Sequence, residues 1–485
     1  MAEKTKVYMK SLALDLVEPG TDEQNRQADL RVSKTLPEGI TSKMLYGDIV
    51  HIAWPSLVEL TLTQLASMVD LMMVGQLGPW ALTAVGLTTQ PKFLLMTMIQ
   101  ALNVGATAMV ARYKGADRQE KANEILRQAL LLTFLIGMFF SVIGFIAAPW
   151  LISFMGAEEG QVMQGAIDYL RIQMIGMPGL ALTATITACL RGVGNSRTAM
   201  IYNAMANLIN VFFNYMLIYG NFGAPKLEVA GASLATIIGQ YCAMVMAFVA
   251  VMNGRQYITL RLRDGFKPNL EEISMIANIG LPAAVEQVVM RIGLIIYSKT
   301  VASLGTLAYA VHQVCLNIQA LSFMNGQAFS VSATSLMGQS LGKKRHDMAQ
   351  AYTMHTRRLG MCVSIILGVI FFFFGGQIVG LYSGGDTSLV EMGSVIMMFV
   401  AVVQPFQSSQ LILAGSLRGA GDTKVTAIIT FITVLLVRPG LAILFINYFH
   451  MGLEGAWYAL VTDQILRSLL VLLRYNSGAW KKHTM

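Results

Sequence analysis

The sequence predicts an all-α integral membrane protein built from twelve transmembrane helices in two six-helix lobes. Its composition indicates a lipid environment, since 55% of the 485 residues are hydrophobic and only 13% are charged, against about 25% charged residues in a soluble domain. Motifs of the first half return in the second at a constant offset of 227 in numbering, as Pro55 and Glu59 do at Pro282 and Glu286. A duplicated membrane half with polar residues inside its spans is a common plan for secondary transporters.

Apolar runs of about 20 residues, the length that crosses a bilayer as a helix, occur twelve times. Six fall in each half, so both halves have the same orientation and the repeat is parallel rather than inverted. The helices are expected at residues 49–74, 85–111, 128–152, 165–190, 199–219 and 230–252 in the first half, and at 274–302, 310–337, 359–381, 392–415, 425–447 and 453–474 in the second.

These helices divide the chain into five segments. The segment 1–48 contains seven Lys or Arg, eight Asp or Glu and no apolar stretch, so we expect a cytoplasmic N-terminal tail rather than a cleaved secretory signal. The expected segments are the tail 1–48, the N-lobe 49–252, a polar cytoplasmic linker 253–273, the C-lobe 274–474 and the C-terminal tail 475–485.

Lys and Arg set the expected orientation. The loops that follow the second, fourth, sixth, eighth and tenth helices each hold two to five of these residues, whereas the opposite loops together hold one, Lys226. Because cytoplasmic loops collect Lys and Arg, both termini are expected in the cytoplasm of a multi-pass cell-membrane protein. The net charge of +8 then reflects topology, and the expected partner is the lipid bilayer rather than a nucleic acid.

Signatures of several enzymes and of nucleotide-driven pumps are missing. No GxxxxGK[ST], HExxH or GxSxG string occurs. We therefore expect no catalytic residue, no enzyme activity and no cofactor. Uphill transport would have to draw on an ion gradient or on the membrane potential, which supplies about 2.3 kcal/mol per charge per 100 mV.

The first predicted helix carries four polar residues on one face, Glu59, Thr63, Ser67 and Asp70. An acid at mid-membrane costs about 2.5–3.5 kcal/mol, so it persists where it faces water, binds a cation or is protonated. We expect Asp70 to bind a proton or a cation. Two interpretations of Glu59 stay open, a coupling role and a structural role shared with its duplicate Glu286.

The fifth predicted helix presents a stripe of amides, Asn203, Asn207, Asn210 and Asn214. Amide oxygens can coordinate a cation or a carboxyl group, and amides can equally hydrogen-bond between helices. The spacing leaves both roles open. Asn203 and Asn207 are candidates for the wall of a substrate cavity.

Polar residues of the second half are harder to assign. Arg291 shares the seventh predicted helix with Glu286 and is a candidate either for the cavity wall or for pairing with an acid of its own lobe. His312 and Gln313 lie on the eighth predicted helix. A lone histidine there is more often a hydrogen-bonded packing residue than a proton carrier.

Further charged residues lie inside predicted helices. Lys92 lies in the second helix, and its counterpart in the repeat is Gln319. Asp463 and Arg467 are four residues apart on the twelfth helix, so they are expected to neutralise each other.

Four stretches carry a resemblance to a known family. The string AWPSLVELTLTQLASMVDLMMVGQLGPWALTAVGL from Ala53, its echo GLPAAVEQ from Gly280, and the two LRGxG loops from Leu190 and Leu417 resemble the bacterial multidrug and toxic compound extrusion (MATE) transporters. The likeness covers roughly residues 45–475. It implies two six-helix lobes around a V-shaped central cavity, and antiport of organic, often cationic, compounds against protons or sodium ions.

The resemblance also implies roles for single residues. Asp70, in MVDLMMVG, matches the aspartate of the first helix that many bacterial members use for coupling. Asn210 and Thr236 match polar residues of a cation site in the N-lobe. Asn214 stands where some members carry a second aspartate, a departure that removes one negative charge and favours a single proton on Asp70. Sodium, if bound, would lie among these four residues.

For the second half, the resemblance implies a C-lobe site. Its candidates are Glu286 and Asp422, and His312 and Gln313 are the other polar candidates of that lobe.

Taken together, the sequence predicts a monomeric antiporter that exports a small organic drug or metabolite in exchange for protons or sodium ions. Two alternatives stay open. A flippase for lipid-linked saccharides would favour additional helices and a basic cavity. A membrane scaffold or a subunit of an ion pump would not need the acid and amide stripes.

Overall fold

The computed structural model describes residues 39–157, 160–382 and 387–482, and these residues are almost entirely helical. The helices of the first half are α3 (Ser42–Gly75), α4 (Pro79–Gly115), α5 (Gln119–Phe154), α6 (Gln161–Gly192), α7 (Ser196–Tyr219) and α8 (Glu228–Met252). Those of the second half are α9 (Leu270–Ala302), α10 (Thr306–Gly342), α11 (His346–Gly380), α12 (Thr387–Gly419), the segment α13–η5 described below, and α15 (Gly452–Asn476). The predicted all-α class is thereby confirmed.

The duplication holds at the level of whole helices. The offset of 227 in numbering separates both ends of α10 from those of α4, and the end of α12 from the end of α6. The helices extend beyond the predicted runs because the apolar pattern marks only the part of a helix that lies in lipid. Helix α11 shows this best, since it begins at His346 rather than at the predicted residue 359. The predicted tail 1–48 lies mostly outside the described residues, and α3 begins inside it, at Ser42.

Eleven helical segments of the described residues are long and apolar enough to cross a membrane, where the sequence predicted twelve. The twelfth is α10, which is a helix of 37 residues but falls short in apolarity. Its sequence contains no charged residue, and its buried polar residues are uncharged Ser, Gln, Asn and His. The predicted span at 310–337 is therefore a helix most of whose polar side chains are covered by protein rather than by lipid.

The eleventh predicted span is an interrupted helix. It consists of α13 (Thr423–Thr430), the π-helical stretch η4 (Phe431–Val437), α14 (Arg438–Ile443) and a second π-helical stretch, η5 (Leu444–Tyr448). Pro439 has no N–H to donate to the preceding turn, and wider π turns are one way in which a helix accommodates such a gap.

The described chain divides into two compact units whose limits fall inside helices. Unit 2 holds 58–114 and 118–280, and unit 1 holds the described residues up to Leu57, the short stretch 115–117 and the chain from Leu281 onward. Helices α3 and α9 thus each begin in one unit and end in the other. Both limits lie within two residues of the repeated prolines Pro55 and Pro282. The units therefore differ from the predicted lobes at these two helix starts.

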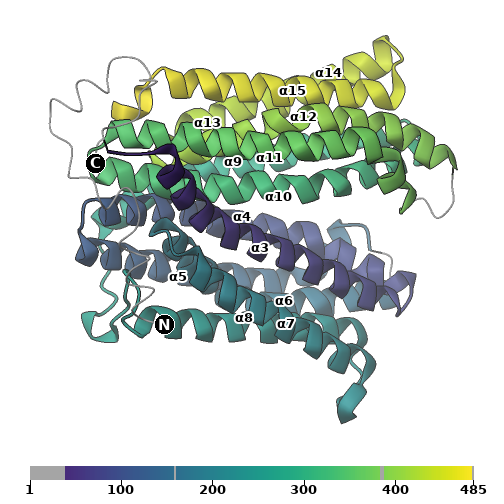
Figure 1. Cartoon of the computed structure of the whole chain (residues 1–485). Helices are drawn as coiled ribbons and strands as arrows, with labels where there is room; N and C mark the ends of the chain where they lie inside the picture. The colour runs from purple at the N-terminus through teal and green to yellow at the C-terminus, as the bar shows by residue number, and fades with distance from the viewer. Residues whose placement is uncertain (1–38, 158–159, 383–386, 483–485) are drawn as a thin grey trace. The chain divides into compact units, whose positions relative to one another are not determined.

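Unit 1 contains a bundle of α10, α11, α12 and α15, which run alongside one another in Figure 1. The first turns of α3 belong to this unit. Leu45, Ile49 and Ile52 are fully buried against residues of α10 and α11. Ser332 donates a hydrogen bond of 2.9 Å to the carbonyl of Ile49, which ties the start of α3 to α10.

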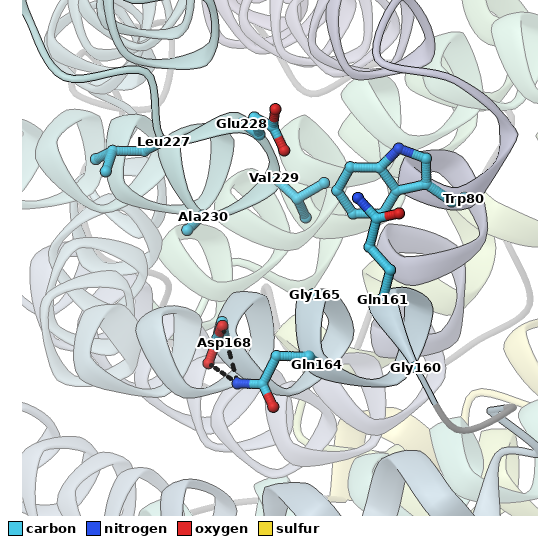
Figure 2. A pocket seen from close by; sticks show the side chains of 10 residues that line it. All are labelled: Trp80, Gly160, Gln161, Gln164, Gly165, Asp168, Leu227, Glu228, Val229 and Ala230. Atoms are coloured by element: carbon cyan, nitrogen blue, oxygen red, sulfur yellow. Dashed lines mark hydrogen bonds between the residues drawn. The ribbon is translucent and has the colours of Figure 1, made fainter.

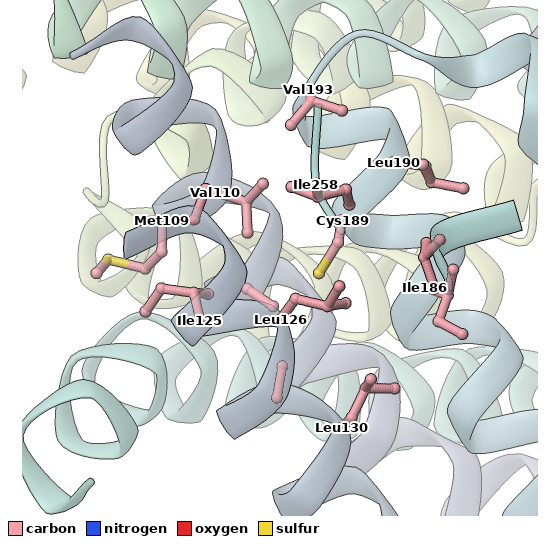
Figure 3. Packing of buried hydrophobic residues seen from close by; sticks show 14 of the residues in the cluster. Met109, Val110, Ile125, Leu126, Leu130, Ile186, Cys189, Leu190, Val193 and Ile258 are labelled. Carbon is pink, nitrogen blue, oxygen red and sulfur yellow. The ribbon is translucent and has the colours of Figure 1, made fainter. Parts of the chain in front are cut away.

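Unit 2 packs α5 on α6, α6 on α8 and α7 on α8. Its largest apolar cluster joins α4, α5 and α6, and Met109, Leu126 and Leu190 are fully or almost fully buried in it (Figure 3). The start of α9 belongs to this cluster through Ile276. A Cβ on Gly105 would collide with the carbonyl oxygen of Ile276, so glycine is required for the close approach of α4 and α9.

Large apolar side chains remain exposed on several helices. Phe139, Ile146 and Trp150 of α5 are 59%, 71% and 65% exposed, and Phe373 of α11 is 68% exposed. Such a surface is costly in water and inexpensive in lipid, which agrees with the membrane class.

Candidate functional site

The two polar stripes predicted on the first and fifth helices face each other in unit 2. Asn203 donates to Glu59 at 2.6 Å, and Asn207 donates to the hydroxyl of Thr63 at 3.1 Å. Asn214 donates a short hydrogen bond to Asp70. All three pairs share one separation in numbering, 144. The equal separation arises because α3 and α7 both advance along one face in steps of three and four residues.

Asp70 is surrounded by amides. The Asn210 amide matches the donors and acceptors around it when its Nδ2 donates hydrogen bonds to both carboxylate oxygens of Asp70, at 2.9 and 3.1 Å. Its Oδ1 then lies 3.2 Å from the backbone nitrogen and 3.3 Å from the hydroxyl oxygen of Thr236. Asn210 and Asn214 are 7% and 0% exposed. The structure thus brings together all four residues of the predicted N-lobe site.

A second chain of polar contacts approaches Asp70 from α4 and α6. Lys92 donates to Gln173 at 2.7 Å, and Gln173 donates to the hydroxyl of Ser233 at 3.1 Å. Ser233 lies three residues before Thr236, on the same face of α8. The ammonium group of Lys92 interacts electrostatically with the Asp70 carboxylate.

Glu59 forms an ion pair rather than an open site. Its Oε2 lies 2.8 Å from Nη2 of Arg191, and its side chain is almost fully buried. Arg191 belongs to the first LRGxG motif. That motif indicated the repeat, but the sequence did not predict a role for its arginine. The conjunction of a repeated Glu with a repeated Arg was the signal that could have found this pair.

The second half repeats the ion pair at the same offset in numbering. Glu286 is 1% exposed, and its Oε1 lies 2.7 Å from Nη2 of Arg418. Thr430 stands at the position of Asn203 and donates to the same oxygen at 3.4 Å. Thr426 donates to the other carboxylate oxygen at 3.2 Å. Of the two interpretations of the repeated glutamate, this geometry favours the structural one.

Two further buried acids of the second half, Asp463 and Asp422, are also neutralised. Asp463 is 0% exposed and pairs with both Arg438 and Arg467, so the expected pair on the twelfth helix has a third member from α14. Asp422 pairs with Arg474 at 2.8 Å. Glu286 and Asp422 thus pair with different arginines, Arg418 and Arg474.

His312 is fully buried and lies among aromatic rings. Its ring centroid is 5.5 Å from that of Tyr297 and 5.6 Å from that of Trp457. Neither ring nitrogen has a hydrogen-bond partner among the described residues, so the expected hydrogen-bonded packing role is correct only as to packing. Gln313, next to it, is partly exposed, and Arg291 lies exposed on α9.

A cavity of about 380 Å³ lies in unit 2 where α4, α6 and α8 begin. Figure 2 shows Trp80 and the acids Asp168 and Glu228 around it, with Asp168 accepting two hydrogen bonds from Gln164. None of the residues predicted for the site lines this cavity. Among the described residues, no group of three or more His, Cys, Asp or Glu is arranged to hold a metal ion.

The fold and this carboxylate site define a multi-span membrane protein with duplicated halves. A family model described as MatE matches residues 55–216 and 282–444. The two matched segments begin at the repeated prolines, Pro55 and Pro282, and together cover more than half of the chain. The chain therefore belongs to the MatE family of transporters, as its sequence motifs predicted.

Curated relatives agree with this assignment. The chain is 28% identical to a "Probable multidrug resistance protein NorM" of Thermotoga maritima over 90% of this chain and 94% of that protein. It is 26% identical to an "Uncharacterized transporter YisQ" of Bacillus subtilis over 89% of this chain and 94% of that protein.

Solved structures show the same fold. One is described as the "Outward-facing conformation of a multidrug resistance MATE family transporter of the MOP superfamily", with a TM-score of 0.84, 21% identity, and coverage of 93% of this chain and 100% of that chain. Another is a MOP superfamily transporter from Pyrococcus furiosus, with a TM-score of 0.84, 22% identity and the same coverage. At this identity the likeness concerns the fold alone.

Proposed function

We propose that this transporter exports lipophilic organic cations in exchange for protons or sodium ions, and that Asp70 is the coupling residue. The arrangement around Asp70 is the observation that supports this proposal. The carboxylate lies inside an apolar helix, is bonded by neutral amides, and has no ion pair within hydrogen-bonding distance among the described residues. An acid held in this way can change its charge without breaking a salt bridge.

Asn214 can serve both charge states of Asp70. Its Nδ2 donates to the ionised carboxylate. Its Oδ1 is buried and has no hydrogen-bond partner in the described part of the chain. When Asp70 is protonated it becomes a donor, and rotation of the amide would present Oδ1 as the acceptor. The loss of the second carboxylate at this position therefore leaves a group that suits a proton.

Water access is supported by the neighbouring polar residues. Thr63 and Ser67 are exposed on the same face of α3, and Asn207 is partly exposed on α7. Polar side chains within a membrane span favour water or protein over lipid. We propose that this face, with Asn203 and Asn207, borders the substrate route. Arg291 is proposed as a further wall residue.

Coupling then follows from differential affinity. A cationic compound is favoured while Asp70 is ionised, and uptake of a proton or cation at Asp70 favours the state that releases the compound. Binding of the ion must distinguish the two states, because a ligand with equal affinity for both shifts neither.

The test uses purified protein in liposomes, with tetraphenylphosphonium as the transported probe. We expect an imposed gradient of the coupling ion, either protons or sodium, to drive its accumulation, and Asp70→Asn to reduce the rate to that of empty liposomes while the protein still reaches the membrane. Undiminished transport by this variant would remove Asp70 from the mechanism. Movement of a lipid-linked saccharide instead of the probe would support the flippase, and no movement of either would support a scaffold or a pump subunit.

The transporter is proposed to act as a monomer in the cell membrane, with both termini in the cytoplasm. Asp117→Cys, placed in a loop rich in Lys and Arg, is then expected to react with a membrane-impermeant maleimide only after the cells are permeabilised. Labelling in intact cells would reverse the proposed orientation. Light scattering of the purified protein would reveal a stable dimer.

A further inference from the structure

We propose that Lys92 is a built-in counter-cation for Asp70, and that it makes the site accept a proton and reject a sodium ion. This inference rests on the proposed function and decides which ion does the coupling. Lys92 is a lysine in an apolar stretch of α4, and it has no part in the transport mechanism proposed above.

Hydrogen bonds link Lys92 to residues next to the Asp70 site. Lys92, Gln173 and Ser233 form a chain of hydrogen bonds from α4 through α6 to α8. Ser233 lies one turn from Thr236, which contacts the amide that holds Asp70. Among the described groups, Lys92 is the charged residue whose field acts on Asp70. Tyr169 of α6 is the other titratable neighbour.

Among the residues that the structure describes, the elements facing Asp70 contribute no further charge. Helix α7 offers Asn210 and Asn214 to Asp70, and Thr236 of α8 contacts Asn210. With Asp70 ionised and Lys92 protonated, the described site has a net charge of zero. Sodium entering this site would make two cations share one carboxylate in a medium of low dielectric constant, where such repulsion is strong.

The orientation of the amides adds to this argument. A sodium ion, as a hard cation, needs several oxygen ligands. With Asp70 ionised, the nitrogens of both Asn210 and Asn214 point at the carboxylate and the oxygen of Asn210 is directed to Thr236. Both amides would therefore have to rotate to offer their oxygens to sodium. A proton requires only one carboxylate oxygen. It comes from the external solution, forms an O–H bond on Asp70, and leaves a neutral acid beside the ammonium group.

The repeat provides an internal comparison. The position equivalent to Asp70 in the second half is Tyr297, and the position equivalent to Lys92 is Gln319. A charged pair in one half thus corresponds to a neutral pair in the other. Gln319 donates to Gln407 at 3.3 Å, which shows that an uncharged side chain is accommodated at this position of the fold.

The experiment compares ion gradients in the same liposome assay. For the wild-type chain, we expect a pH gradient at equal sodium to drive tetraphenylphosphonium transport, and a sodium gradient at equal pH to leave the rate at its no-gradient value. Lys92→Gln, which copies the second half, is expected to gain a severalfold sodium-driven rate. Lys92→Arg keeps the charge and is expected to keep the wild-type ion preference.

Lys299→Gln is the matched control. Lys299 is an exposed lysine near the end of α9, and its removal is expected to leave the ion preference unchanged. Sodium-driven transport by the wild-type chain would overturn the proposal. An unchanged ion preference in folded Lys92→Gln would overturn it as well.

A second measurement does not depend on transport. Dicyclohexylcarbodiimide modifies protonated carboxyl groups in apolar surroundings, and the modified peptide can be identified by mass spectrometry. In the wild-type chain we expect modification of Asp70 to fall as the pH rises and to be equal in sodium chloride and choline chloride. Protection by sodium would overturn the role of Lys92. Failure of transport under both gradients would instead contradict the proposed function, and the modification result would still decide the ion preference.

Discussion

The two halves share one buried glutamate at the repeat position and differ in their other acids. Glu59 pairs with Arg191 at 2.8 Å, and Glu286 pairs with Arg418 at 2.7 Å. Another acid of the first half, Asp70 on α3, faces amides. Another acid of the second half, the buried Asp463 on α15, faces two arginines.

This comparison separates structural acids from a candidate coupling acid. An acid that arginine neutralises is held in its charged form, because protonation would leave the guanidinium group unpaired in a buried position. Asp70 contacts neutral donors and can lose its charge at a lower cost. Asp463 stands at the repeat position of Thr236, so the same location in the fold holds a hydroxyl in one half and a neutralised acid in the other.

The largest expected effect in this comparison belongs to Asp463→Asn. Removing the carboxylate leaves Arg438 and Arg467 buried without a partner, a change that typically costs about 3–5 kcal/mol. We expect a strong fall in the yield of folded protein and in the midpoint of thermal unfolding in detergent. A normal unfolding midpoint would show that water reaches this cluster, and it would weaken the contrast with Asp70.

Glu59→Gln and Glu286→Gln come next. Each breaks a buried ion pair whose arginine remains partly exposed, so we expect a loss of about 2–3 kcal/mol, below the range for fully buried pairs. The two losses should be similar because the pairs are duplicates. A stable Glu59→Gln variant that has lost transport would return Glu59 to the list of coupling residues, and thermal unfolding alongside the liposome assay distinguishes these outcomes.

Asp70→Asn is expected to change stability by about 1 kcal/mol or less, because an amide can keep one hydrogen bond to Asn214 or Asn210. The same variant is expected to lose transport. A large drop in the unfolding midpoint would mean that Asp70 supports the fold as the arginine-paired acids do. The comparison between the halves would then fail.

The smallest effect is expected for Thr430→Asn. The residue at the equivalent position of the first half is Asn203, which makes the same kind of hydrogen bond to its glutamate. We expect the free energy of unfolding to change by less than about 1 kcal/mol, the value of an ordinary hydrogen bond. The midpoint of thermal unfolding measures this change. A loss as large as that of Glu286→Gln would show that the two ion pairs do not share one geometry.

Much of the polar site could be predicted because the spacing of residues along a helix determines which of them share a face. The steps of three and four residues that join Glu59 to Asp70, and Asn203 to Asn214, each define one face. The sequence could not show that these two faces meet, since nothing in one helix specifies which neighbour it packs against. The sequence did not predict Arg191 and Gln173 as partners for the same reason, although Arg191 belongs to the repeated LRG motif.

By itself, the sequence determined the class of the protein, the duplication and the helices, because apolar length and period are local properties of a chain in lipid. Only the tertiary structure decided which acids are neutralised, because an ion pair depends on side chains that are distant along the chain. It also showed that the first turns of α3 and α9 belong to units other than those of the rest of their helices. The helix starts belong to these units because of packing between segments that lie far apart in the sequence, as between Ile49 and Ser332. No local sequence pattern predicts such packing.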